Sequence, residues 1–386
     1  MSNKSIALNL RRIRGFNGLS QENVAKKAGI SLPAYRKLES GVSMPRVNTL
    51  QGISQALGVK LQDLVTPVRA LKAVRFRALK RMTSREQILA DAANWLKDYN
   101  EFEEIAQEKA LYTLGKVTKE LHRLAGRGQR PIEAAKRVRE VLGLSPEETI
   151  RDTCGLLESA GIKLYLYTLA SDSFFGLSIG EEDGGPAIVV NVWDRISVER
   201  RIFSAAHELG HLILHNDAFD VNETEENEAQ EAEANRFAGH FLMPNELFRK
   251  EWEAARGLPL IPRVMKVKRM FKVSYKTVLV RLIENGAADN RVWPSFKAQF
   301  RAVYGHALTN KEEPFPADEK AFRQSPSEVF SAREPERLLD ADFMEDRLSR
   351  LVRKAIESES ISMSRGAEVL KMDLDSMRNW SASWGD

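Results

Sequence analysis

Two histidines four residues apart frame the segment His207-Glu208-Leu209-Gly210-His211. In a helix this spacing places both imidazoles on one face, where they can offer two nitrogen ligands to a single zinc ion. Glu208 follows His207 by one residue, which is about 100° around such a helix. Its carboxylate can therefore take a proton from a water molecule beside the metal without binding the metal itself. This pattern predicts a zinc site at which a carboxylate assists hydrolysis.

A third ligand is expected from a carboxylate in the later helical segment Glu231-Ala232-Glu233-Ala234-Asn235-Arg236-Phe237-Ala238. Glu231 stands four residues before Asn235, so on a helix Asn235 can orient a group at the metal from just outside the site. We therefore predict Glu231 as the third ligand, with Glu233 as the alternative on the same helix. His215 lies four residues after His211 and is expected at the end of the histidine helix, where it interacts with the helix dipole or lines the cleft.

The N-terminal part of the chain carries an excess of positive charge. Residues 1–81 hold 16 Lys and Arg but only 3 Asp and Glu, which suggests a polyanionic partner. Ser20 and Ser31 are candidate N-caps of two short helices, and Gly29 is a candidate for the tight turn between them. The second helix of such a pair fits the major groove of DNA.

The side chains that this arrangement offers to DNA fall into two kinds. Arg36 and Lys37 can reach phosphates or guanine edges, and Gln21 can bond a phosphate from a helix N-terminus. The alternative is that this unit serves as a dimerisation or protein-binding module.

The elements that must position these residues can be read from hydrophobic spacing and from Gly and Pro breaks. Helices are expected at 132–142, 146–160, 198–215 and 228–241, and β-like runs at 162–168, 174–179 and 187–192. The expected fold is mainly α with a small β-sheet. It comprises a five-helix DNA-binding domain at 1–67, a helical connector at 68–130, an α+β zincin-like domain at 131–290 and a helical C-terminal segment at 291–386.

The N-terminal pattern resembles the phage-repressor helix-turn-helix family, often called XRE. The resemblance covers about residues 4–66 and is carried by Leu19-Ser20-Gln21-Glu22-Asn23-Val24-Ala25, Ala28-Gly29-Ile30-Ser31, Leu38-Glu39-Ser40-Gly41 and Ala56-Leu57-Gly58-Val59. It implies that positions 32, 33, 36 and 37 face double-stranded DNA, so the predicted contacts are Gln21, Ser31, Leu32, Pro33, Arg36 and Lys37. Leu32 and Pro33 cannot hydrogen-bond through their side chains, so the expected readout is apolar contact with thymine methyls, together with Arg36 and Lys37.

The second half resembles the ImmA/IrrE family of metallopeptidases over about residues 131–285. The resemblance is carried by Ala206-His207-Glu208-Leu209-Gly210-His211-Leu212, Glu231, Asn235-Arg236-Phe237-Ala238 and Phe241-Leu242-Met243-Pro244. It implies zinc ligands at His207, His211 and Glu231, a catalytic carboxylate at Glu208, and substrates that are repressor-like or antitoxin-like proteins.

The predicted function is therefore a DNA-binding transcriptional regulator with a zinc-dependent, gluzincin-like endopeptidase domain that cleaves a repressor- or antitoxin-like protein or itself. The alternative is an antitoxin-like repressor whose zinc domain is a non-catalytic sensor or a scaffold that binds a toxin. A homodimer on a palindromic operator is expected, by analogy with helix-turn-helix dimers. The single cysteine, the absence of a signal-like N-terminus and the lack of long apolar runs predict a cytoplasmic protein without a membrane span.

Overall fold

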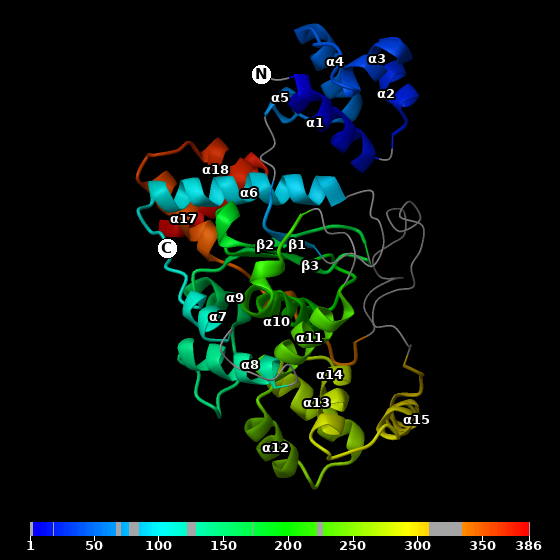
Figure 1. Ribbon diagram of the computed structural model, residues 1–386, viewed down its shortest axis with the longest axis vertical. Coiled ribbons are helices and arrows are strands. Elements are labelled where there is room, and N and C mark those ends of the chain that lie inside the picture. Colours follow the sequence, from blue (N-terminus) through cyan, green and yellow to red (C-terminus); the bar gives the residue numbers. More distant parts are fainter. Residues whose placement is uncertain are drawn as a thin grey trace. The chain divides into compact units, whose positions relative to one another are not determined.

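The computed structural model describes residues 3–17, 19–66, 71–76, 85–121, 129–171, 173–221, 227–308 and 334–385 (Figure 1). The chain forms two compact units. The first comprises Met1–Leu71 and Lys80–Asp98, and the second comprises Lys72–Leu79 and Tyr99–Asp386. The expectation of a mainly helical fold with a small sheet is confirmed. No helix of the described residues is long and apolar enough to cross a membrane.

The first unit contains the five expected short helices. They are α1 (Asn3–Phe16), α2 (Gln21–Lys27), α3 (Leu32–Glu39), α4 (Val47–Leu57) and α5 (Leu61–Val65), and the longer α6 (Arg85–Ile105) contributes residues to both units. The Ser20 and Ser31 hydroxyls cap α2 and α3, and Gly29 turns between them with φ +67°. The apolar faces of the five short helices meet in one core, which includes Val24, Tyr35, Ile53 and further residues of α1 and α5.

The second unit is built on a four-stranded mixed sheet in the order β1-β3-β4-β2. The strands are β1 (Val74–Phe76), β2 (Lys163–Tyr167), β3 (Gly176–Ile179) and β4 (Ala187–Asn191). β2 pairs with β4 in parallel, whereas β1 and β4 both pair with β3 antiparallel. Three of these strands match expected runs. β1 lies in the segment that was expected to be a helical connector.

Two long helices carry the predicted metal ligands. α10 (Val198–Leu214) packs against β3 and β4, and α11 (Glu228–Leu242) packs against α10 (Figure 1). A Cβ atom at Gly210 would lie 3.0 Å from Phe237 and 3.3 Å from the Ala234 backbone. The missing side chain therefore lets the two helices approach closely, and this approach brings residues of α11 next to the histidine face of α10.

The remaining α-helices that the structure describes in the second unit pack on this pair, on the sheet or on one another. They are α7 (Gly115–Leu121), α8 (Arg130–Val141), α9 (Thr153–Ser159), α12 (Asn245–Ala254), α13 (Leu260–Phe271), α14 (Tyr275–Glu284), α15 (Val292–Tyr304), α17 (Arg347–Glu357), α18 (Met363–Val369) and α19 (Leu374–Ala382). The expected helix at 146–160 is wrong in its first half. The helix begins only at Thr153, because Asp152 adopts an extended backbone and its carboxylate caps the Gly155 amide.

Buried charges join the later helices to this core. The Glu103 carboxylate near the end of α6 lies 2.7 Å from an Arg347 nitrogen of α17 and 3.3 Å from the Lys163 ammonium of β2. Lys268 of α13 contacts Glu199 of α10 at 2.5 Å.

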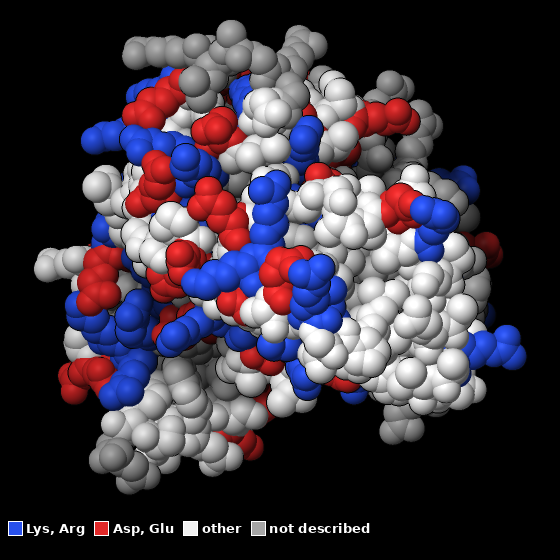
Figure 2. Space-filling model, turned by 90° about the horizontal axis from the view of Figure 1, so that it is seen from below, with Lys and Arg blue, Asp and Glu red and all other residues white. Residues whose placement is uncertain are grey.

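The surface charges are mixed on the face shown in Figure 2. Basic and acidic side chains lie interspersed there, and much of the right-hand side carries neither. That face therefore presents no extended field of one sign.

Candidate metal centre and nucleic-acid interface

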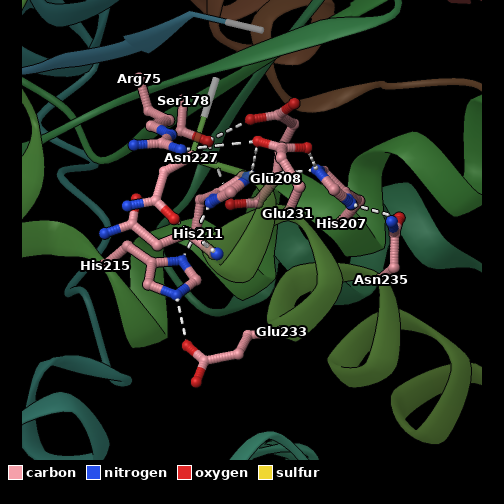
Figure 3. A network of polar contacts seen from close by, with 11 residues as sticks. Arg75, Ser178, His207, Glu208, His211, His215, Asn227, Glu231, Glu233 and Asn235 are labelled. Carbon is pink, nitrogen blue, oxygen red and sulfur yellow. Dashed lines mark hydrogen bonds and ion pairs between the residues drawn. The ribbon is translucent and has the colours of Figure 1, made fainter. Parts of the chain in front are cut away.

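Three of the predicted metal-binding side chains converge in the second unit. His207, His211 and Glu231 each offer a ligand atom, and these atoms all lie within 4.8 Å of one another. The Nε2 atoms of the two histidines are 3.0 Å apart, and each lies 3.2 Å from an oxygen of Glu231. Figure 3 shows the Glu231 carboxylate facing both rings. The alternative ligand, Glu233, does not join this group.

The outer nitrogen of His207 is held by Asn235. Its Nδ1 lies 2.9 Å from the Asn235 Oδ1 atom, which can only accept a hydrogen bond. Nδ1 therefore carries the proton, and Nε2 presents a lone pair toward His211 and Glu231. Asn235 stands one helical turn after Glu231 on α11, as the sequence spacing predicted for a residue that orients the site.

A two-step relay sets the tautomer of His211. Glu233 accepts a hydrogen bond from His215 Nε2 at 2.9 Å, so the Nδ1 atom of neutral His215 is an acceptor. His211 Nδ1 lies 3.0 Å from that atom and donates to it. The Nε2 atom of His211 is then left with a lone pair that faces the site, as a metal ligand requires.

This arrangement fits a metal cation. Two imidazole lone pairs and a carboxylate point toward one another, so the cluster needs positive charge at its centre. A proton is poorly suited to supply it, because burial lowers the pKa of His211 to about 4. A His₂Glu donor set of this kind is typical of zinc.

Glu208 lies beside these groups and contacts the sheet. The Ser178 hydroxyl of β3 donates to Glu208 Oε2 at 2.5 Å, and Figure 3 shows the Glu208 carboxylate next to that of Glu231. Gly176 lets β3 pass close to this side chain, since a Cβ there would lie 3.1 Å from Glu208 Cγ. The carboxylate is thus held close to the ligand group by a strand that is itself buried.

Two contacts at the site were missed from the sequence. Ser178 could have been noticed as a polar residue within an otherwise apolar run, and it is fully buried. Arg75 of β1 carries no comparable sequence signal, yet its guanidinium lies 3.6 Å from a Glu231 oxygen. His215 was expected at a helix end. It is the C-cap residue of α10, and it also takes part in the relay to His211.

A cavity of about 600 Å³ borders the site between α10, α11 and α14. Its lining includes Asn235, which bonds His207, and the basic residues Arg200, Arg236 and Lys276. Phe203 adds an apolar surface to the same cavity. The cavity thus reaches the outer edge of the metal site from the α11 side.

The candidate DNA-contact residues lie on α2 and α3 of the first unit. Pro33, Arg36 and Lys37 are exposed, Gln21 and Leu32 are half-buried, and Ser31 is exposed while its hydroxyl caps α3. Gln21 Oε1 accepts a hydrogen bond of 3.4 Å from Arg36 Nε, so the two side chains support each other at the surface.

The only acidic residue of α3 does not share this exposed face. Glu39 is buried and pairs with Arg14 of α1, with Glu39 Oε1 2.6 Å from Arg14 Nη2. Burial would raise the pKa of Glu39, but the Arg14 guanidinium outweighs this and lowers it. The exposed charged side chains of α3, Arg36 and Lys37, are therefore both basic. On α2, Lys26 and Lys27, which were not predicted as contacts, are exposed as well, together with the acidic Glu22.

Comparisons with known proteins match both halves of the chain. Residues 10–64 match a family model described as helix-turn-helix, and residues 163–283 match one described as the IrrE N-terminal-like domain of the M78 peptidases. The chain is 42% identical over 64 residues to an uncharacterized HTH-type transcriptional regulator, y4dJ, of Sinorhizobium fredii, covering 17% of this chain and 83% of that protein. The chain is also 37% identical over 82 residues to a second uncharacterized HTH-type transcriptional regulator, YqaE of Bacillus subtilis. That match covers 21% of this chain and 71% of YqaE.

A solved structure of a Mycobacterium tuberculosis transcriptional regulator is also similar, with 20% identity and a TM-score of 0.29. The match covers 47% of this chain and 52% of that one. This TM-score is too low to establish a shared fold.

Proposed function

This chain belongs to the XRE-type helix-turn-helix transcriptional regulators and carries an ImmA/IrrE-type peptidase domain, and on this basis we propose that it is a DNA-binding regulator with zinc-dependent endopeptidase activity. Residues 1–67 bind operator DNA as a homodimer in the cytoplasm. Residues 131–290 form the main part of the peptidase domain, β1 of the connecting segment 68–130 adds a strand to its sheet, and residues 291–386 follow. The substrate is a repressor- or antitoxin-like protein, or the chain itself.

The observation that carries the peptidase assignment is the convergence of the ligand atoms of His207, His211 and Glu231, with the Glu208 carboxylate beside them. These three residues would hold the zinc ion. When bound, zinc supplies a Lewis acid that polarises a peptide carbonyl and makes water more acidic.

The roles of the surrounding residues follow from their contacts. Glu208 accepts a proton from the attacking water and returns it to the leaving amine. Ser178 holds the Glu208 carboxylate in place through its hydroxyl. Asn235 and His215 keep both ligand histidines in the tautomer that faces the site. The cavity beside Asn235 offers room for substrate residues next to the site.

The substitution Glu208→Gln tests this proposal because it keeps the side chain's shape and removes the base. We expect the purified variant to bind one zinc per chain and to lose cleavage of the chain itself and of repressor-like proteins encoded beside its gene. The matched control is Glu246→Gln on the exposed side of α12, which should cleave normally. Loss of zinc from Glu208→Gln would instead make Glu208 a ligand.

A second candidate function is supported by the burial of the ligand residues. In that case the zinc site stabilises a scaffold that senses a ligand or binds a toxin, and the chain acts as an antitoxin-like repressor. The same experiment separates the two functions. Equal inactivity of the unchanged chain and Glu208→Gln toward all these substrates, with zinc bound in both, would favour the scaffold.

A further inference from the structure

Residues 72–76 form a short strap along the edge of the sheet. In β1, Val74 is opposite Ile179 and Arg75 is opposite Ser178 of β3. The segment before the strand is anchored as well. The Asp183 carboxylate accepts hydrogen bonds from the Lys72 and Ala73 amides at 2.6 and 2.7 Å.

The strand that receives this strap is the one that contacts the proposed base. Ser178 of β3 donates to Glu208, and its partner across the strands is Arg75. The Arg75 guanidinium then lies 3.6 Å from the proposed ligand Glu231. The backbone of the strap therefore pairs with the strand that holds Glu208, and its Arg75 side chain reaches the metal centre, as Figure 3 shows.

The metal centre is closed in this arrangement. His207, His211 and Glu231 are only 2%, 0% and 7% exposed, and none of them is among the residues that line the neighbouring cavity. A peptide bond must reach such a centre to be hydrolysed. Some element that now covers the site therefore has to move, and the strap is attached to the sheet edge that contacts Glu208.

Extended peptides commonly bind proteins by adding a strand to an exposed sheet edge. Removal of β1 would expose the edge of β3 for this purpose. We propose that residues 72–76 occupy the position of a peptide substrate on β3, and that a protein substrate enters as an extended strand by displacing them. This inference rests on the proposed peptidase function. The sequence Val74-Arg75-Phe76 further indicates the preferred ligand, an extended segment with a basic residue between two apolar ones.

Binding to an inactive variant tests this displacement. In the zinc-loaded Glu208→Gln chain, the additional substitution Asp183→Ala removes the acceptor that anchors the strap. The probe is a fluorescein-labelled hexapeptide with the sequence of residues 71–76, followed by fluorescence anisotropy. We expect Asp183→Ala to raise its affinity by about tenfold or more, an amount that corresponds to about 1.4 kcal/mol. A hexapeptide with Glu at the position of Arg75 should not show this gain.

The matched control is Asp373→Ala, which removes a comparable cap from α19, far along the chain. It should leave peptide affinity unchanged. Equal affinities for the Asp183→Ala variant and the unchanged Asp183 chain, or an equal gain for the Glu-containing peptide, would overturn the proposal. Hydrogen exchange should also show faster exchange of the residue 73–76 amides when the hexapeptide is added.

A second variant covers the case in which Asp183→Ala does not fold. Val74 and Ile179 face each other across the two strands, and the single native cysteine, Cys154, is buried. The paired substitutions Val74→Cys and Ile179→Cys should form a disulfide that fixes the strap. We expect the oxidised form to exclude the hexapeptide and reduction to restore its binding. Equal binding before and after reduction would contradict displacement.

These outcomes separate the inference from the peptidase function itself. If the hexapeptide binds competitively but the unchanged chain cleaves no protein, the peptidase function fails and displacement of the strap stands. If the chain with Val74→Cys and Ile179→Cys and an intact Glu208 cleaves its substrate equally fast when oxidised and reduced, displacement fails and the peptidase function stands.

Discussion

The Nδ1 atoms of His211 and His215 lie 3.0 Å apart, and this contact determines which nitrogen of His211 faces His207 and Glu231 in the candidate metal site. The Glu233 carboxylate starts the relay by accepting from His215. Glu233→Ala should release His215 and let His211 adopt the wrong tautomer. We expect zinc affinity to fall by about 10- to 100-fold, measured by competition with a chromophoric chelator. Glu228→Ala, in the exposed first turn of the same helix, should retain the original affinity.

Removal of a proposed metal ligand should weaken zinc binding more than removal of the Glu233–His215 relay does. His207→Ala leaves one imidazole and one carboxylate, so we expect its zinc content after dialysis to be close to zero. A metal ion that binds only the folded chain stabilises it, so the loss of this site should also lower the melting temperature. His306→Ala, which changes an exposed histidine, is the control. Undiminished zinc in His207→Ala would remove this residue from the site.

The exposed basic face of α3 should contribute to DNA affinity. Arg36→Ala combined with Lys37→Ala removes two cations that can contact phosphates or guanine edges. We expect weaker operator binding. The slope of the logarithm of the binding constant against the logarithm of the salt concentration should be smaller in magnitude by about two, measured by fluorescence anisotropy across a salt series. Arg378→Ala on α19 should change neither quantity. An unchanged slope in the double variant would place α3 outside the interface.

A buried carboxyl group makes stability sensitive to pH. Burial, followed by the nearby Glu345 and Asp346 carboxyls, raises the pKa of Glu158 to about 8 from its ordinary 4.5. The folded state therefore holds a proton that the unfolded state releases, and this stabilisation is complete below about pH 4.5 and is lost as pH rises toward 8.

The substitution Glu158→Gln should remove this dependence. Its free energy of unfolding, measured with urea, should fall less between pH 5 and 8 than that of the unchanged chain, by an amount on the order of 1 kcal/mol per pH unit. The control is Glu133→Gln, at an exposed position of α8. Parallel pH profiles for Glu158→Gln and the unchanged chain would show that Glu158 is charged in the folded state.

The features that could be predicted from the sequence are those encoded over a few residues. Ser20, Gly29 and Ser31 define α2 and α3 because caps and tight turns are local. The spacing of His207 and His211 similarly fixes their common face. The convergence of Glu231 with this pair also needs a close approach of two helices, which Gly210 permits. The four-residue spacing from Glu231 to Asn235 correctly indicated which face of α11 lies at the site, but it could not show that α11 approaches α10 closely.

The features that were missed depend on contacts between distant segments. β1 has three residues, and its pairing with β3 crosses about 100 positions of the chain, so its own sequence contains too little information to predict it. The Arg75 contact with Glu231 follows from that pairing. The relay from Glu233 through His215 likewise depends on how α11 lies against the end of α10, which no local pattern specifies.

The interleaved order of the two units limits how this protein can be rearranged in evolution. The chain passes between the units at 71/72, 79/80 and 98/99, so recombination at one point cannot exchange one intact unit for another. A gene fragment that starts at residue 131 would lack β1 and would leave Lys163 and Arg347 without the Glu103 carboxylate. We therefore expect the helix-turn-helix part and the peptidase-like part of this chain to be inherited together with the segment that connects them.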